Sequence, residues 1–138
     1  MFLQFIDQGN LIDDNTILVR RTLRSGQKVN FSGNVVILGD VNPGAEVKAF
    51  GHVIVFGSLR GMVHAGADGN EQAVVIAFRL QPTQLRIANH ITRPPEDGSA
   101  APDQPEIARI KDNVVTIDTF QSGSERQIPQ KETDRYLT

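Results

Sequence analysis

Cysteine is absent from this sequence of 138 residues, and long hydrophobic runs are absent as well. Without cysteine, disulfide bonds and thiolate metal sites are excluded, which is consistent with a reducing cytoplasm. Apolar runs such as residues 35–38 fall far short of the ~20 residues that a membrane-spanning helix needs. The first residues also lack a basic stretch followed by an apolar segment. We therefore expect a cytoplasmic protein with neither a signal peptide nor a membrane helix.

An excess of positive charge is also missing, because the formal net charge is -2. Nucleic acid is therefore not an expected partner. The sequence has no G-x-x-x-x-G-K-[ST] phosphate loop, no dinucleotide-binding glycine fingerprint and no G-x-S-x-G motif. The acidic residues form no catalytic pair in the repeat described below, and the three histidines are scattered. We predict a protein that is not an enzyme, with no catalytic residues, no metal and no cofactor.

The sequence does contain an internal repeat. Glycines recur 18 residues apart in three sets: Gly33, Gly51 and Gly69; Gly39 and Gly57; Gly26 and Gly44. The apolar residues Leu23, Val41 and Leu59 keep the same spacing, and Leu80 continues their column after a three-residue insertion near residues 70–72. Self-similarity at one fixed period indicates a repeat architecture.

The segments between the glycines predict strands, because they are rich in β-branched residues and bounded by turn formers. Eighteen extended residues at ~3.3 Å each trace roughly 60 Å, which closes as a three-sided coil with about six residues per side. The sequence therefore predicts an all-β fold: a short, three-sided parallel β-helix (a β-solenoid) of about four coils over residues 16–93. A β-sandwich also suits short strands and glycine turns, but it does not require this register across several columns. The spacing does not determine handedness.

The composition changes after the repeats. Residues 94–105 contain four of the seven prolines and predict a loop. Residues 107–110 and 114–117 are mostly apolar and flank Lys111, Asp112 and Asn113, which is a hairpin-like pattern. We interpret residues 94–120 as a proline-rich loop plus a capping hairpin, since a solenoid must cover its last strand edge. Residues 1–15 are interpreted as a lead-in or linker, and residues 121–138 as a mobile tail.

The strands carry more apolar residues than a solenoid needs. Successive residues of a strand face opposite ways, so only every second residue fills the interior. Residues 35–38, 53–56 and 74–78 are apolar at nearly every position, and a monomer does not normally expose such a sheet. We predict a symmetric homodimer through this sheet, with an interface formed by Val36, Leu38, Ile54, Phe56, Val75 and Ala77. The pattern leaves open which face is the dimer face, and burial under residues 94–120 is the alternative.

A polar corner accompanies this sheet. In the 18-residue register, Arg24, Asn42 and Arg60 form one column, which Gln81 continues. Lys28, Glu46 and His64 form a second column, in which Lys28 and Glu46 can pair for ~0–1 kcal/mol. On composition alone this corner is a solvated edge of the solenoid.

Several motifs resemble one family. Residues 21–27, R-T-L-R-S-G-Q, are similar to the sequence that opens the carboxy-terminal domain of the MinC family. Residues 41–47, 57–61 and 65–67 resemble the stretches that follow it in that family. The resemblance covers roughly Thr16 to Pro94, and residues 105–120 look like an extension that some members carry.

This resemblance implies a right-handed β-helix that dimerises through one sheet. It also implies binding to the ATPase MinD through Arg24, Ser25, Gly26 and Gln27, to which we add Asn42 and Glu46 from the adjacent columns. The family positions the division septum by inhibiting FtsZ assembly, mainly through a separate amino-terminal domain. Only about 15 residues precede the repeats here. We therefore expect MinD binding and dimerisation, with recruitment to the inner face of the membrane only indirectly, through MinD.

Two other classes of function remain as alternatives. A self-polymerising scaffold resembling bactofilins shares the glycine-punctuated coils but does not explain the R-S-G-Q corner. A β-solenoid transferase or polysaccharide enzyme usually needs more coils and clustered catalytic residues. Filaments formed by the chain alone would favour the scaffold.

Overall fold

The computed structural model describes residues 15–93 and 102–120, and all regular elements in these two segments are strands. The predicted lead-in (apart from Asn15), most of the proline-rich loop and the predicted tail lie outside the described residues. The strands are β1 (Thr16–Val19), β2 (Lys28–Phe31), β3 (Asn34–Ile37), β4 (Glu46–Ala49), β5 (Val53–Leu59), β6 (Met62–Ala65), β7 (Val75–Leu80), β8 (Gln84–Ile87), β9 (His90–Thr92), β10 (Glu106–Lys111) and β11 (Val114–Thr119).

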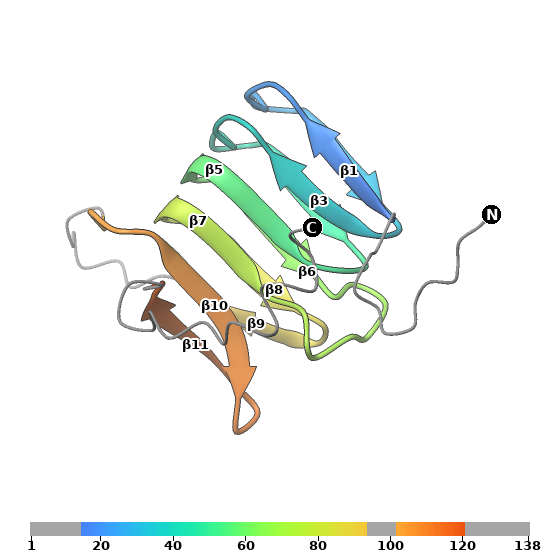
Figure 1. Ribbon diagram of the computed structural model, residues 1–138, viewed down its shortest axis with the longest axis vertical. Coiled ribbons are helices and arrows are strands. Elements are labelled where there is room, and N and C mark those ends of the chain that lie inside the picture. Colours follow the sequence, from blue (N-terminus) through green and yellow to red (C-terminus); the bar gives the residue numbers. More distant parts are fainter. Residues whose placement is uncertain (1–14, 94–101, 121–138) are drawn as a thin grey trace, which may run out of the picture.

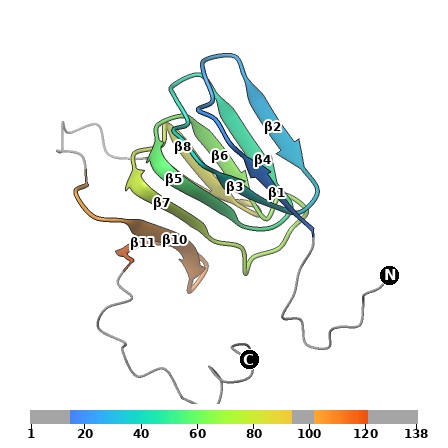
Figure 2. The ribbon, with the colours of Figure 1, turned by 45° about the horizontal axis from the view of Figure 1, so that its top comes forward.

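The strands form two sheets that run along the stack of coils. One sheet has the order β1-β3-β5-β7-β10-β11 (sheet A), and the other has the order β2-β4-β6-β8-β9 (sheet B). Figure 1 shows β1, β3, β5 and β7 side by side, and Figure 2 shows the β2, β4, β6 and β8 layer beside them. The third side is reduced to single bridges that join Leu23 to Val41 and Val41 to Leu59 in parallel. The predicted three-sided solenoid of about four coils is confirmed.

The 18-residue register is kept through the first two coils. Thr16 pairs with Asn34, and Lys28 pairs with Glu46. It breaks on sheet B at the third coil, where Glu46 pairs with Met62 and Lys48 with His64. The predicted column of Lys28, Glu46 and His64 is therefore wrong at His64. The cause is the third corner at Gly61, which is two residues shorter than the corners before it.

The fourth coil corrects two predicted interface residues. Val53 pairs with Val75 and Val55 with Ala77, whereas Leu59 pairs with Leu80, with a register shift between Val55 and Ser58. The insertion is thus four residues long at the start of β7, and the irregularity in β5 absorbs one of them. A slip of one residue moves a side chain to the other face of a sheet. Val75 and Ala77 therefore point into the core, both at 0% exposure, and the outward residues of β7 are Ile76 and Phe78.

The core consists of stacked apolar columns, one layer per coil. One column is Leu23, Val41, Leu59 and Leu80, and all four are buried. Others run along the two sheets, as in the column of Val47, Val63 and Leu85. No polar or charged side chain is buried in the part of the chain that the structure describes. Neighbouring coils therefore stabilise each other by burying apolar surface, which contributes ~25 cal/mol of free energy per Å² buried.

Polar side chains at the corners hold the backbone of the next coil. The Asn34 Oδ1 accepts a hydrogen bond from the His52 N–H at 2.8 Å, and the His52 Nδ1 accepts one from the Val74 N–H at 3.0 Å. Likewise, the Asp40 Oδ1 accepts from the Ser58 N–H at 2.8 Å. Backbone donors at the corners need such acceptors, because the strands on either side do not reach them.

The predicted carboxy-terminal hairpin is present as β10 and β11. Its turn residues Asp112 and Asn113 have φ values of 52° and 65°, as the two central residues of a type I′ turn require. Strand β10 pairs antiparallel with β7, and Ala108 completes the core at 0% exposure. On sheet B, β9 turns back antiparallel to β8. The hairpin extends sheet A sideways instead of lying across its outer face (Figure 1).

The short third corner leaves no space for a side chain at Gly61. A Cβ atom at Gly61 would collide with the carbonyl oxygen of Ala45 and lie 2.7 Å from that of Asn42. Gly61→Ala is therefore expected to lower the free energy of unfolding by about 2–3 kcal/mol in a denaturant titration. Gly69→Ala is the control, because a Cβ atom at Gly69 would meet no atom within 4 Å and only its φ of +105° opposes a side chain. That variant should lose only about 1 kcal/mol, and equal losses would contradict the steric explanation.

Candidate functional site

The R-S-G-Q sequence forms a tight turn at the corner between Leu23 and β2. The Gln27 N–H donates to the Arg24 carbonyl at 2.9 Å, and Gly26 has a φ of +88°. These are the features of a type II turn, which needs a residue with positive φ at its third position. Glycine adopts this conformation without steric cost. Ser25 and Gly26 are exposed at the tip of the turn.

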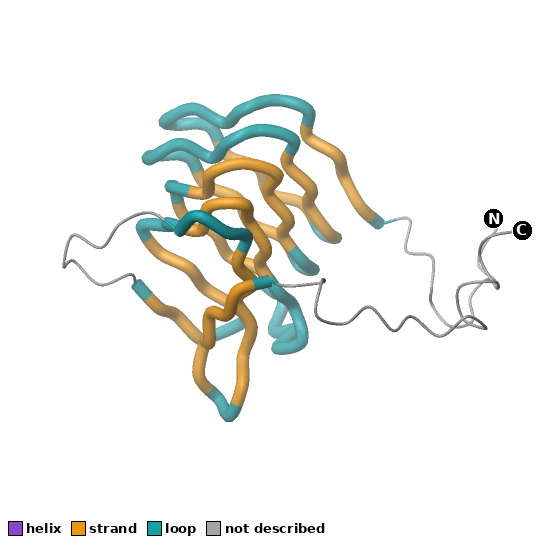
Figure 3. The backbone as a smooth tube through the Cα atoms, turned by 60° about the vertical axis from the view of Figure 1, so that its left-hand side comes forward, coloured by secondary structure: helices purple, strands orange, loops and turns teal. Residues whose placement is uncertain are grey.

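The second coil repeats this turn directly beside the first. The Ala45 N–H donates to the Asn42 carbonyl at 2.9 Å, with Pro43 in the second position and Gly44, at φ +90°, in the third. The Gly26 N–H donates to the Gly44 carbonyl at 2.9 Å and so ties the two turns together. Figure 3 shows such loops stacked at the ends of the strands. We call the two adjacent turns, residues 24–27 and 42–45, the corner.

The side chains of the corner differ in what they bind. Arg60 donates from Nη2 to the Asn42 Oδ1 at 3.0 Å, as the predicted column of Arg24, Asn42 and Arg60 implies. Lys28 Nζ lies 3.9 Å from the Glu46 Oε2, and both side chains are exposed, so this pair adds little stability. The Arg24 guanidinium is exposed and has no hydrogen bond or ion pair with any described residue. Arg24 is thus the cation of this corner that is available to a partner.

The outer face of sheet A is apolar. By register it carries Leu18, Val36, Leu38, Ile54, Phe56, Ile76 and Phe78. Phe56 and Phe78 are 46% and 48% exposed, and their rings meet edge to face with centroids 5.4 Å apart. Val36, Leu38, Ile54 and Phe56, which were predicted to form a dimer interface, thus share this outer face. The described residues of the 102–120 segment leave this face open, so they do not supply the alternative cover.

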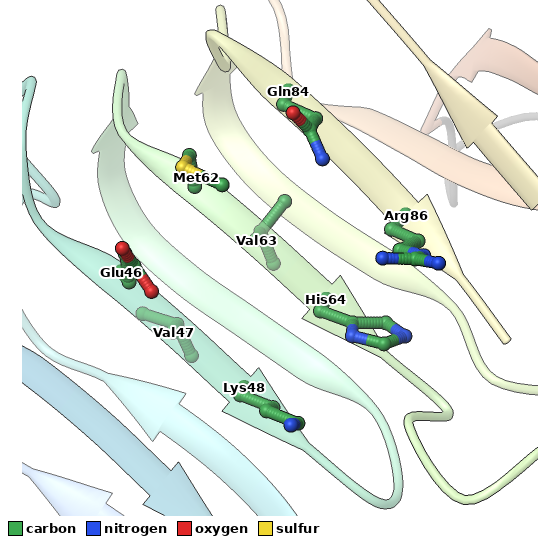
Figure 4. Close-up of a pocket in the computed structure, with 8 residues that line it drawn as sticks. All are labelled: Glu46, Val47, Lys48, Met62, Val63, His64, Gln84 and Arg86. Atoms are coloured by element: carbon green, nitrogen blue, oxygen red, sulfur yellow. The ribbon is translucent and has the colours of Figure 1, made fainter. Parts of the chain in front are cut away.

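A shallow hollow of about 180 Å³ lies on the outer face of sheet B. Figure 4 shows Lys48, His64 and Arg86 side by side at one end of it, with Glu46, Met62 and Gln84 at the other end. The His64 Nε2 lies 3.0 Å from the Ala88 carbonyl oxygen. Partial burial is the main cause that lowers the pKa of His64, and the charges of Arg86 and Lys48 lower it further, against the raising effect of the Ala88 carbonyl. The positive charge of the hollow at neutral pH therefore comes from Lys48 and Arg86.

Within residues 15–93 and 102–120, no three His, Asp or Glu side chains lie close enough to hold a metal ion. The same residues form no helix long and apolar enough to cross a bilayer. The features that stand out are an exposed arginine on a stiff double turn and an apolar sheet face, which suit binding to other proteins.

Fold and site together define a short β-solenoid with an exposed arginine at one corner and an open apolar sheet face. Residues 17–120 match the family described as septum formation inhibitor MinC, C-terminal domain. The chain belongs to this family, which is named for septum formation and not for a reaction.

Relatives and a solved structure agree with this assignment. The chain is 62% identical over 112 residues to a probable septum site-determining protein MinC of Heliobacterium modesticaldum, covering 81% of this chain and 39% of that protein. It is 56% identical over 108 residues to the one of Clostridium novyi, covering 78% and 51%. The chain thus spans about half or less of the length of these relatives. A solved MinC:MinD cell division protein complex of Aquifex aeolicus contains a chain with 35% identity and a TM-score of 0.75, covering 80% of this chain and 90% of that one.

Sequence reasoning missed two outward residues, Ile76 and Phe78, although both lie in a segment that it identified. The signal was the exact length of the insertion before β7, which the Leu80 column alone does not reveal. The predicted corner residues Arg24, Ser25, Gly26, Gln27 and Asn42 do come together, and Glu46 lies next to them on β4.

Proposed function

We propose that this chain is the MinD-binding and dimerisation unit of a septum site-determining protein and has no catalytic activity of its own. Its MinD site is built from Arg24, Ser25, Gly26, Gln27 and Asn42 of the corner, together with the adjacent Glu46. The outer face of sheet A joins two copies of the chain. By holding the division inhibitor at MinD, the unit helps to prevent FtsZ assembly away from the division site.

The observation that carries the proposal is the likeness to a chain from a MinC:MinD complex, at 35% identity over most of both chains. The geometry of the corner supports it. Two stacked type II turns form a stiff platform, and the Arg24 side chain projects from it with five donors and no partner among the described residues. A fork of this kind suits a carboxylate or backbone carbonyls on a partner. Contact with FtsZ belongs mainly to the part of the relatives that this chain does not span.

The apolar sheet supports the homodimer. Three exposed apolar side chains support it: Phe56 of β5 and Phe78 of β7, whose rings meet, and Leu38, which directly follows β3. A two-fold axis through such a face would bring these side chains against those of the second copy and bury them. The proposed location is the cytoplasm, with recruitment to the inner membrane face through MinD.

A binding experiment tests this function directly. The purified chain is expected to be a dimer by light scattering at tens of micromolar and to be retained by immobilised MinD loaded with ATP. Retention should depend on MinD, so beads without MinD and beads carrying an unrelated ATPase serve as controls. If the chain does not bind MinD but forms filaments by itself, the result would contradict the proposal and favour the self-polymerising scaffold.

A further inference from the structure

Both backbone polar groups of Arg24 are bound by one residue, Gln27. The Gln27 N–H donates to the Arg24 carbonyl at 2.9 Å, and the Gln27 Oε1 accepts from the Arg24 N–H at 2.8 Å. Because an N–H group is a donor, the atom of the Gln27 amide that faces it must be the oxygen. Before Arg24, the chain is anchored by Leu23, which is buried in the core. These contacts fix the peptide planes on both sides of the Arg24 Cα, and hence the direction in which its side chain leaves.

The other coils show why the first one needs this contact. The residues equivalent to Arg24 are Asn42, Arg60 and Gln81. Each donates its backbone N–H to the preceding coil, to the carbonyl oxygens of Leu23, Val41 and Leu59 at 2.9, 2.8 and 2.9 Å. No coil precedes the first one among the described residues, so the Arg24 N–H has no such carbonyl to meet. The Gln27 Oε1 takes that place, and Ala45 stands at the equivalent position of the second coil, where no replacement is needed.

The two turns are also stiffened by different means. In the second coil, Pro43 fixes φ at the second position of the turn. In the first coil, that position is Ser25, whose backbone has no such restriction. The bond between Gln27 and Arg24 therefore does for the first turn what proline does for the second. Without it, the turn that carries Arg24 would sample more conformations and would pay their entropy on binding.

We propose that Gln27 is a positioning residue of the partner site: its Oε1 holds the Arg24 peptide so that the guanidinium is presented to MinD, and Gln27 itself does not contact MinD. This inference rests on the proposed function. It separates two residues that adjoin in the same motif, because Arg24 acts through its side chain and Gln27 acts through Arg24.

The proposal makes the amide oxygen of Gln27 essential and its NH₂ group dispensable. Gln27→Glu keeps an acceptor at the same reach, whereas Gln27→Leu keeps the size and loses the acceptor. Gln27→Leu is expected to weaken binding to ATP-loaded MinD about tenfold, and Gln27→Glu to stay within about threefold of the wild type. Amide hydrogen exchange of the free chain, followed by NMR, should find the Arg24 N–H protected in the wild type and in Gln27→Glu but not in Gln27→Leu.

The two measurements separate the outcomes. Wild-type affinity in Gln27→Leu would overturn the proposal, and so would an unprotected Arg24 N–H in the wild type. Loss of binding in Gln27→Glu with the Arg24 N–H still protected would also overturn it, because Gln27 would then contact MinD through its NH₂ group. If the wild-type chain keeps Arg24 protected but does not bind MinD, the proposed function fails, and the positioning role falls with it.

Discussion

Replacing Phe56 and Phe78 together by aspartate is expected to convert the proposed dimer into a folded monomer. Both rings are about half exposed on the outer face of sheet A and contact each other edge to face. In a symmetric interface each substitution occurs twice, so four aromatic anchors would be replaced by four desolvated carboxylates. Truncating one central anchor costs ~2 kcal/mol or more. The dissociation constant of the dimer should therefore rise at least about 1,000-fold. Light scattering or sedimentation over a concentration series measures this.

A neighbouring residue supplies the control. Val55 precedes Phe56 on β5 but faces inward at 0% exposure, so Val55→Asp should fail to fold instead of becoming a monomer. A circular dichroism melt separates the two results. If the Phe56/Phe78 variant remained a dimer with wild-type affinity, the interface would lie elsewhere on the molecule. If the wild type were already a monomer at tens of micromolar, the apolar face would not mediate self-association, and the proposed dimer would be wrong.

The solenoid was predictable because the residue pattern that determines it recurs with a fixed period along the sequence. Each coil must place a core residue such as Leu23, Val41 or Leu59 at the same point of the same path, and glycine recurs where the corners turn. A repeat of this kind determines sides, strand pairing and approximate coil number without any knowledge of long-range contacts. The hairpin was predictable for a local reason as well, since its turn residues favour positive φ.

The errors arose where the period is broken. On sheet B, the shortened corner at Gly61 brings His64 beside Lys48 instead of Glu46. On sheet A, an extra residue before Val75 is absorbed again before Leu80, so the ends of the segment look aligned while its middle is shifted by one. Because strand side chains alternate between faces, this single shift moved Val75 and Ala77 from the predicted interface into the core. Counting residues between columns cannot locate such an irregularity.

The corner was predictable as a location but not as a mechanism. The sequence places Arg24 and Gln27 in one motif, and residue types alone assign both to the partner. The structure binds the Gln27 amide oxygen to the Arg24 N–H at 2.8 Å. That contact follows from the position of the motif in the first coil, where the carbonyl acceptor of a preceding coil is missing from the described chain. A residue pattern does not show that one coil lacks a backbone acceptor which the other coils have.

Arg24→Ala is expected to weaken binding to ATP-loaded MinD by at least about 30-fold while leaving dimerisation and the melting temperature nearly unchanged. The side chain is exposed and has no hydrogen bond or ion pair with any described residue, so its removal takes little from the fold. The turn remains closed, because its two hydrogen bonds join the Arg24 backbone to Gln27. The loss therefore falls on the interface, where truncating an arginine anchor leaves its acceptors on the partner unpaired.

Two further variants show whether the effect belongs to this guanidinium. Arg24→Lys keeps the charge but loses the planar fork with its five donors, so it should bind between the wild type and Arg24→Ala. Arg86→Ala removes the same charge from the outer face of sheet B, away from the corner, and should bind MinD as the wild type does. Calorimetric affinities, together with a melting curve for each variant, measure both expectations. Unaltered affinity in Arg24→Ala would remove this residue from the site, equal losses in Arg24→Ala and Arg86→Ala would indicate general charge attraction, and a large fall in melting temperature would mean that Arg24 holds the coil together.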